Sequence, residues 1–396
     1  MVNFHKVPQG ELKARIAKLK EEMTKTQPGW QFLAISSRMN LYYFTGTMQN
    51  SVLVITPRSE TLWVRRSYDR AVLESEFWDI RPMASYRDMA YNISGGVAHV
   101  ERRQVSLDWL DLFGRYFKFD TYAGLDSQVA YLRSVKSAYE LDIMEQCGRL
   151  HEAMVKEFVP TALREGMTEC ELGCEMFSYY VNRGHQGIVR FQMPYGETLI
   201  GHIGFGDSPL CPSAFDGASG TVGVSPAAPV FGSSRKLAHG DLVYLDTISA
   251  IFGYNTDKTF VFSYGKQPEQ YVMDAHKYCL ELQDKIVALL KPGAIPQQVY
   301  EQILAGVKPE FLENFMGKDG NKVRFLGHSV GLTVDEPPVI ASGFTDPIEE
   351  NMTFAIEPKY SIPGVGMVGI ENTFVVEKNG ARCLTGKDFD ILTVGV

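Results

Sequence analysis

Apolar residues recur at helical spacing and at strand spacing in turn along the first third of the chain. An amphipathic helix is predicted at residues 11–24, and a second helix near 68–76. Short runs rich in β-branched and apolar residues predict strands between them, at residues 32–35, 52–55, 61–64 and 104–107. Helices mixed with strands predict a small α/β domain over residues 1–132.

From Lys136 onward the helical pattern dominates. A long helix is predicted at 136–159, and a second begins near Thr168, where Thr168 and Glu171 have the spacing of a capping box. Gly184 is the expected stop. The following segment, 203–240, is rich in Gly, Ser, Pro and Ala, and its length is typical of a functional loop or lid.

The rest of the chain repeats this order of elements. Leu163–Met167 resembles Leu290–Ala294, and each stretch lies between a long helix and a shorter one. Strands are then expected at 242–245, 259–262, 352–357 and 366–376, after helices at 267–291 and from Pro296. The pattern predicts a duplicated helix–helix–strand–strand unit over residues 133–396.

Composition and charge exclude several classes of protein. A formal net charge of −8 disfavours nucleic-acid binding. The charged N-terminus is unlike a signal peptide, and no run of about 18 apolar residues predicts a membrane span. Six scattered cysteines indicate a reducing, cytoplasmic setting. Cys170 and Cys174 are interpreted as small buried thiols, with zinc binding as the alternative.

Four acidic residues follow or interrupt apolar strands: Asp246, Asp257, Glu357 and Glu371. If the repeated halves pack about a pseudo-twofold axis, Asp246 faces Glu357 and Asp257 faces Glu371. Four buried carboxylates need about four positive charges, which two divalent ions supply. His328 adds an imidazole, which favours Mn, Fe, Co or Zn over Mg or Ca.

These motifs resemble the M24 peptidase family, which includes Xaa-Pro aminopeptidase, prolidase and creatinase. The residues at 246 and 257 match its first two ligands, and Gly327–Pro338 resembles its histidine motif. Glu357 before Pro358, and Glu371 after Gly369-Ile370, resemble its last two. Asn40–Gly46 resembles the creatinase/prolidase N-terminal domain, and Lys136-Ser137 with Glu140 the start of the catalytic domain.

The resemblance implies an α+β pita-bread catalytic domain behind a smaller creatinase-type domain, and a homodimer. Asp257 and Glu371 would bridge two metals, Asp246 would bind one of them, and His328 with Glu357 would complete the other. The expected activity is hydrolysis before proline in a small peptide by a metal-bridging hydroxide, with Glu357 relaying protons. Manganese is the expected metal, with Zn, Co or Fe as alternatives.

Three positions depart from the peptidases of this family. Asp335 replaces a histidine, Gly369 replaces an arginine, and Val230 stands where a histidine is usual. His202 is a candidate replacement for that last histidine. Segment 203–240 is the expected specificity element, because loops vary on a rigid scaffold.

Three other readings stay open. The first is a lyase resembling the dimethylsulfoniopropionate-cleaving branch, with Asp335 as base, although Ile248 stands where that branch has a further Asp. The second is creatinase-type or ectoine-type C–N hydrolysis of another small zwitterion. The third is a binding module without activity, although such modules usually lose the ligands that this chain keeps.

Overall fold

A computed structural model describes residues 4–89, 91, 95–192, 196–213, 215, 217–386 and 390–395. The chain divides into two compact units, Met1–Arg133 and Ser134–Val396. Among the helices within these described ranges, none is both long enough and apolar enough to cross a membrane.

The first unit is built on one mixed sheet with the strand order β4-β3-β2-β1-β5-β6. Its strands are β1 (Phe32–Ile35), β2 (Ser51–Ile55), β3 (Glu60–Val64), β4 (Ile80–Pro82), β5 (Val97–Val100) and β6 (Thr121–Gly124). Its helices are α1 (Gln9–Thr26), α2 (Arg38–Thr45), α3 (Tyr68–Glu74), α4 (Leu107–Gly114) and α5 (Asp126–Ser134), with a 3₁₀ turn at Tyr86–Met89. Strands β2 and β3 pair antiparallel as a hairpin.

The strand predicted at residues 104–107 is wrong. Ser106 instead caps helix α4, because its side chain accepts a hydrogen bond from the Trp109 backbone N–H. The strand of this region is β5, which pairs parallel to β1 and to β6. A single capping contact therefore outweighed the strand propensity of the short run.

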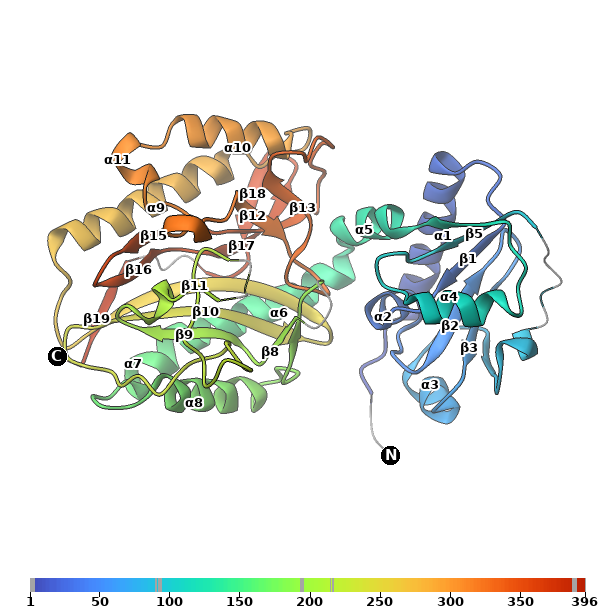
Figure 1. Ribbon diagram of the computed structural model, residues 1–396, viewed down its shortest axis with the longest axis horizontal. Coiled ribbons are helices and arrows are strands. Elements are labelled where there is room, and N and C mark those ends of the chain that lie inside the picture. Colours follow the sequence, from blue (N-terminus) through green and yellow to red (C-terminus); the bar gives the residue numbers. More distant parts are fainter. Residues whose placement is uncertain are drawn as a thin grey trace. The chain divides into compact units, whose positions relative to one another are not determined.

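The second unit places its strands between two groups of helices (Figure 1). One group comprises α6 (Ala138–Ala153), α7 (Val159–Ala162) and α8 (Glu169–Val181), with a π-helical turn at Met154–Phe158. The other comprises α9 (Gln270–Leu289), α10 (Pro296–Ala305) and α11 (Pro309–Leu312). The predicted capping box at Thr168 and Glu171 is confirmed, with both reciprocal hydrogen bonds present.

Antiparallel pairs dominate the sheets between these helices. One sheet has the order β19-β11-β10-β9, from β9 (Gly201–Phe205), β10 (Leu242–Ile251), β11 (Tyr254–Tyr264) and β19 (Leu392–Val394). Another has the order β13-β12-β14-β17-β18, from β12 (Phe325–Ser329), β13 (Glu336–Ala341), β14 (Thr353–Ile356), β17 (Asn372–Glu377) and β18 (Gly380–Cys383). Helices followed by an antiparallel strand pair, long in β10–β11 and shorter in β14–β17, thus occur twice, which confirms the predicted duplication.

The last strands are broken where the acidic residues stand. The single strand predicted at 366–376 is wrong, because the chain forms β16 (Gly366–Gly369), leaves the ladder at Glu371 and continues as β17. β16 pairs instead with β15 (Lys359–Ile362) in a separate two-stranded ladder. Glu357 stands at the corresponding break between β14 and β15. Both glutamates therefore occupy points where the chain changes sheet.

The segment at 203–240 has little regular structure beyond the end of β9, a 3₁₀ turn at Ser208–Leu210 and isolated bridges. Two of its residues, 214 and 216, lie outside the described part of the chain. The short β7 (Val189–Arg190) and β8 (Glu197–Thr198) pair with each other just before it.

Candidate metal centre

The four acidic residues singled out by the sequence converge in the second unit. Asp246 lies within β10 and Asp257 within β11, while Glu357 and Glu371 stand at the strand breaks. Their exposed fractions are 7%, 5%, 3% and 1%, so all four carboxylates are removed from bulk water. Buried carboxylates at this density require cations or protons beside them.

One cation comes from the chain itself. The ammonium of Lys359 donates to Asp246 Oδ2 at 3.0 Å, to Glu357 Oε2 at 2.8 Å and to Glu371 Oε2 at 2.8 Å. Burial alone would lower the pKa of Lys359, but the three carboxylates outweigh it and raise this pKa well above its usual value. Lys359 is therefore a charged side chain at the middle of the cluster, 2% exposed.

Asp246 has the most hydrogen-bond donors of the four. Besides Lys359, its Oδ2 accepts from Ser219 Oγ at 3.1 Å and from Tyr244 Oη at 3.2 Å. Burial raises the pKa of this carboxyl, but Lys359, His202 and the hydrogen bonds lower it further, to about 2. Asp246 is consequently an anion across the physiological range.

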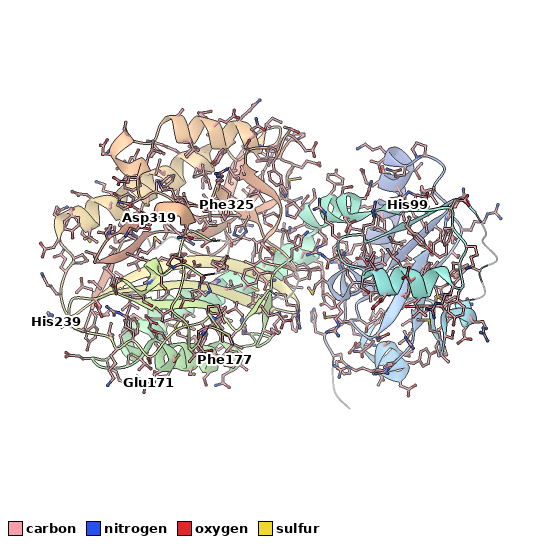
Figure 2. The ribbon with its side chains drawn as sticks, in the orientation of Figure 1. His99, Glu171, Phe177, His239, Asp319 and Phe325 are labelled. Carbon is pink, nitrogen blue, oxygen red and sulfur yellow. The ribbon has the colours of Figure 1, made fainter. Side chains whose placement is uncertain are left out.

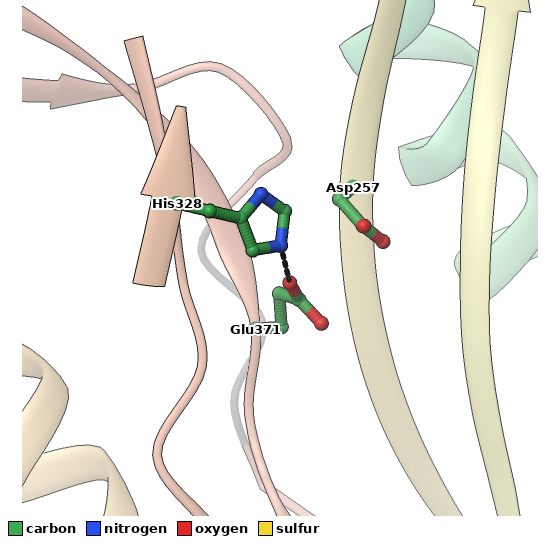
Figure 3. Close-up of side chains that lie close together, drawn as sticks. All are labelled: Asp257, His328 and Glu371. Atoms are coloured by element: carbon green, nitrogen blue, oxygen red, sulfur yellow. Dashed lines mark ion pairs between the residues drawn. The ribbon is translucent and has the colours of Figure 1, made fainter. Parts of the chain in front are cut away.

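On the opposite side of the cluster, no lysine or arginine among the described residues forms an ion pair with the carboxylates. One ligand atom from each of Asp257, His328 and Glu371 lies within 4.8 Å of the other two. Figure 3 shows the three side chains close together. His328 Nε2 is 3.9 Å from Glu371 Oε1 and 3.5 Å from Glu357 Oε1. Asp257 Oδ1 and Glu371 Oε1 are buried and have no hydrogen-bond partner among the described residues.

On this side of the cluster, the pKa values of both Asp257 and Glu371 are raised. Burial, followed by repulsion from Glu371, raises the pKa of Asp257 well above its usual value. Burial, followed by repulsion from Glu357, raises the pKa of Glu371 to about 8. Two unpaired carboxylate oxygens beside an imidazole nitrogen are a suitable donor set for one divalent transition-metal ion. The residues present fit one such ion here.

A second ion beside Asp246 does not fit the same arrangement. Its donors would be the oxygens that already accept from Lys359, so the ammonium and the ion compete for one place. The donor set therefore accommodates one ion next to one ammonium.

The cluster lies in a cavity of about 550 Å³, a size suited to a small ligand. Four phenylalanine side chains line this cavity together with the carboxylates: Phe191, Phe215, Phe325 and Phe344. Phe325, labelled in Figure 2, packs edge-on to His328 with ring centroids 6.1 Å apart. Exposed Lys322 and Arg324 add positive charge to the lining.

Asp335 also lines the cavity, so the residue that replaces a histidine lies close to the cluster. Its Oδ1 accepts a hydrogen bond from the Gln192 backbone N–H. Burial raises the pKa of Asp335, while that hydrogen bond and the proximity of His328 lower it in part. Asp335 is thus a cavity carboxylate beside the imidazole.

His202 and Val230 do not line the cavity. His202 is the cross-strand partner of Asp246 and packs edge-on to Phe215, which does line it. Burial lowers the pKa of His202, and the nearby Asp246 charge raises it in part. Val230 is half-buried in the loop before β10.

Gly369 lies directly opposite Lys359 in the β15–β16 ladder. Its φ of +127° belongs to a region that residues with a side chain rarely adopt. A Cβ at this position would lie 2.4 Å from the Pro358 carbonyl oxygen and 2.7 Å from the Lys359 Cα. The backbone is therefore built around a glycine, and the arginine that the family resemblance leads one to expect has no place here.

Sequence reasoning missed Lys359, Ser219, Tyr244 and Thr259, which all contact the carboxylates. A signal for Lys359 was present. It stands between Glu357-Pro358 and the run Tyr360-Ser361-Ile362, and a lysine in such a segment is buried only when paired. The three hydroxyl-bearing residues carry no comparable signal.

Comparisons with known proteins identify the family and the fold. Residues 142–378 match the pattern of metallopeptidase family M24, and residues 15–135 that of the creatinase/prolidase N-terminal domain. The chain is 24% identical to the Xaa-Pro dipeptidase of Pyrococcus furiosus, over 96% of this chain and 100% of that one. The prolidase structure from Pyrococcus horikoshii superposes with a TM-score of 0.77 at 22% identity, covering 95% of this chain and 99% of that chain.

The same fold occurs in a protein whose description names no peptidase. The N-terminal domain of FACT complex subunit SPT16 from chickpea superposes with a TM-score of 0.72 at 13% identity, over 98% of this chain and 99% of that chain. Activity must therefore be argued from the cluster and its cavity, since the fold alone does not decide it.

Proposed function

Because the chain belongs to metallopeptidase family M24, with the pita-bread fold of that family, we propose that it hydrolyses short peptides at the bond before proline in a metal-dependent reaction. The observation that carries this proposal is the convergence of Asp257, His328 and Glu371 in a cavity of dipeptide size. The relatives described as Xaa-Pro dipeptidases support the choice of bond.

In this proposal Asp257, His328 and Glu371 hold a divalent ion, with Glu357 Oε1 beside them. Such an ion would polarise a peptide carbonyl and lower the pKa of a water molecule. Glu357, whose Oε2 is fixed by the hydrogen bond from Lys359, would carry a proton to the leaving amine. Asp335 holds the substrate's ammonium in the cavity. His202, which packs against Phe215 and is the cross-strand partner of Asp246, positions Asp246.

Several finer expectations belong to the same proposal. Manganese is our first choice of metal, because carboxylates and one imidazole suit it. We also propose that the chain forms a homodimer and works in the cytoplasm. The six free cysteines support that compartment. A domain boundary at residues 132–133 is supported by the compact units that meet at Arg133 and Ser134.

The test is an assay of proline release from Xaa-Pro dipeptides before and after metal removal. We expect release with the metal-loaded protein, loss after chelation and recovery on adding Mn²⁺. His328→Ala should abolish release together with metal binding, whereas Lys322→Ala, on the exposed part of the cavity lining, should retain metal binding. A metal-loaded wild type that leaves every Xaa-Pro peptide intact contradicts the proposal.

A second candidate is an enzyme acting on a small zwitterion, by elimination or C–N hydrolysis. The observation that favours it is the set of four phenylalanine rings lining the same cavity as Asp335. Aromatic faces and a carboxylate together bind alkylated cations such as sulfonium or quaternary ammonium groups. The expected arginine at position 369 is also absent.

The two candidates separate on products and on Asp335. Elimination from a zwitterion gives an alkene that is detected by its absorbance or by mass spectrometry, and peptides give none. In elimination Asp335 is the base, so Asp335→Asn should mainly lower kcat, whereas for a peptide whose ammonium Asp335 holds it should mainly raise the KM. Alkene formation without proline release would favour the second candidate over the first.

A further inference from the structure

Lys359 is the part of the cluster that the predicted two-metal centre does not account for. An ammonium has three hydrogens, and here each meets a different carboxylate oxygen at 3.0 Å or less. The side chain is 2% exposed and bound on all three donor directions. The Lys359 ammonium is thus a fixed cation of the chain itself, and it lies where the three carboxylates would otherwise bind a metal ion.

The two glutamates divide their oxygens between two sides. Glu357 directs Oε2 to Lys359 and Oε1 toward His328 Nε2, 3.5 Å away. Glu371 likewise directs Oε2 to Lys359 and Oε1 toward His328, at 3.9 Å. Two cation positions are therefore bridged by the same two carboxylates, and the chain occupies one of them.

Backbone geometry holds Lys359 at this place. Its strand, β15, pairs with β16 over four register positions, and the Lys359 carbonyl accepts from the Met316 N–H at 2.9 Å. Gly369, opposite Lys359, leaves no side chain on the facing strand. Moving the ammonium away would leave the buried carboxylates of Asp246, Glu357 and Glu371 without their positive partner, which is costly. The long lysine side chain would also have to be placed elsewhere.

We propose that this protein has a mononuclear metal centre in which the Lys359 ammonium permanently takes the place of a second divalent ion. The inference rests on the proposed metal site of Asp257, His328 and Glu371. Lys359 acts as a positioning residue. By holding Oε2 of Glu357 and Oε2 of Glu371, it leaves Oε1 of each facing the single ion, and it supplies the positive charge beside Asp246 on the other side of the cluster.

Metal content per chain tests the inference without an activity assay. Purified protein is dialysed against excess Mn²⁺, Co²⁺ or Zn²⁺ and then against metal-free buffer, and bound metal is measured by mass spectrometry. We expect one ion per wild-type chain. Lys359→Met keeps the length but removes the charge, so it should bind a second ion and show a larger rise in Tm on metal addition.

Lys136→Met is the matched control. Lys136 is another 2%-exposed lysine of the same unit, 3.6 Å from Glu336 and outside the carboxylate cluster. Its loss should lower stability but leave the stoichiometry at one. If Lys359→Met remains at one ion, the lysine does not replace a metal and the inference fails.

Amine labelling of the wild type covers the case in which Lys359→Met does not fold. Lys359 should resist acetylation at saturating metal, whereas displacement by a second ion would expose it to the reagent. Two tightly bound ions per wild-type chain, or labelling of Lys359 on metal addition, overturn this inference and leave the proposed function standing. A wild type that binds no ion overturns both.

Discussion

Thr259 Oγ1 donates a hydrogen bond to Glu371 Oε2 at 2.9 Å, and the two residues also pair through their backbones. The contact joins β11 of the first half of the duplicated unit to the strand break of the second half. It fixes the rotation of the Glu371 carboxylate, which in turn decides where Oε1 points. The Thr259 hydroxyl thus controls the orientation of the Glu371 carboxylate, which is one of the proposed metal ligands.

Removing this hydroxyl should weaken metal binding. Thr259→Val keeps the shape, and we expect metal affinity to fall about tenfold, as is typical when the partner of a metal ligand is lost. Thr256→Val is the matched control, because Thr256 lies on the same strand and its buried Oγ1 has no partner among the described residues. Isothermal titration with Mn²⁺ measures both, and equal affinities would contradict the assignment.

Acid should destabilise the fold through His151. Burial lowers the pKa of His151 to about 3, from 6.5, and Ser249 N–H donates to its Nε2. The native state therefore keeps the ring neutral while the unfolded chain takes up a proton below pH 6.5. Stability is present above that pH and is lost as pH falls toward 3, by up to about 1.4 kcal/mol per unit.

Denaturant unfolding between pH 7 and pH 4 measures this loss. His151→Gln should be less stable at pH 7, because a buried ring and its contacts are lost, but its stability should fall less steeply with acid. His185, whose pKa burial lowers to about 4, contributes a slope of the same sign in both proteins. Parallel curves for wild type and variant would exclude His151 as a source.

Glu101 holds the start of α2 in the first unit. Although it is fully buried, its carboxylate accepts hydrogen bonds from the Ser36 and Ser37 backbones and from the side chains of Ser37 and Asn40. Glu101→Gln turns one acceptor into a donor facing other donors. We expect a loss of about 2–4 kcal/mol in unfolding free energy.

The control for this change is Glu21→Gln on the exposed face of α1. It should alter stability by less than about 0.5 kcal/mol. Urea unfolding followed by the fluorescence of Trp30 and Trp63, both in the first unit, reports on the relevant part of the chain. A Glu101 variant as stable as the Glu21 variant would show that the network contributes nothing.

Restoring a side chain at position 369 should damage the protein rather than improve it. Gly369→Ala must adopt a φ of +127° and meet the Pro358 carbonyl, so we expect a loss of about 3 kcal/mol or more, and more for Gly369→Arg. Gly343 has a φ of +91° with nothing near its missing Cβ. Gly343→Ala therefore isolates the conformational cost, about 1–2 kcal/mol. Thermal unfolding of both variants gives the difference, and similar losses would contradict the clash.

Local patterns predicted more of this protein than long-range ones. The capping box at Thr168 depends on residues three apart, and it formed as expected. The strand predicted at 104–107 is wrong because Ser106 caps a helix there, although the short apolar run by itself is typical of a strand. The duplication was visible because it repeats an order of elements, which survives when individual residues diverge.

The acidic residues of the metal centre could be predicted from the sequence, but the lysine among them could not. The carboxylates stood out because each interrupts an apolar strand. Lys359 reaches Asp246 across 113 positions of chain, and no spacing rule links the two. The positive φ of Gly369 could not be predicted either, because only the contacts with the facing strand show that this position requires a glycine.

The pairing of Lys359 with Gly369 also limits which substitutions the hairpin of β15 and β16 accepts. An arginine at 369 meets the main chain of the neighbouring strand, whatever residue stands at 359. Losing the lysine alone leaves three acids without the counter-ion that the chain supplies. A side chain at 369 therefore requires a different hairpin backbone, whereas a new residue at 359 requires another source of positive charge.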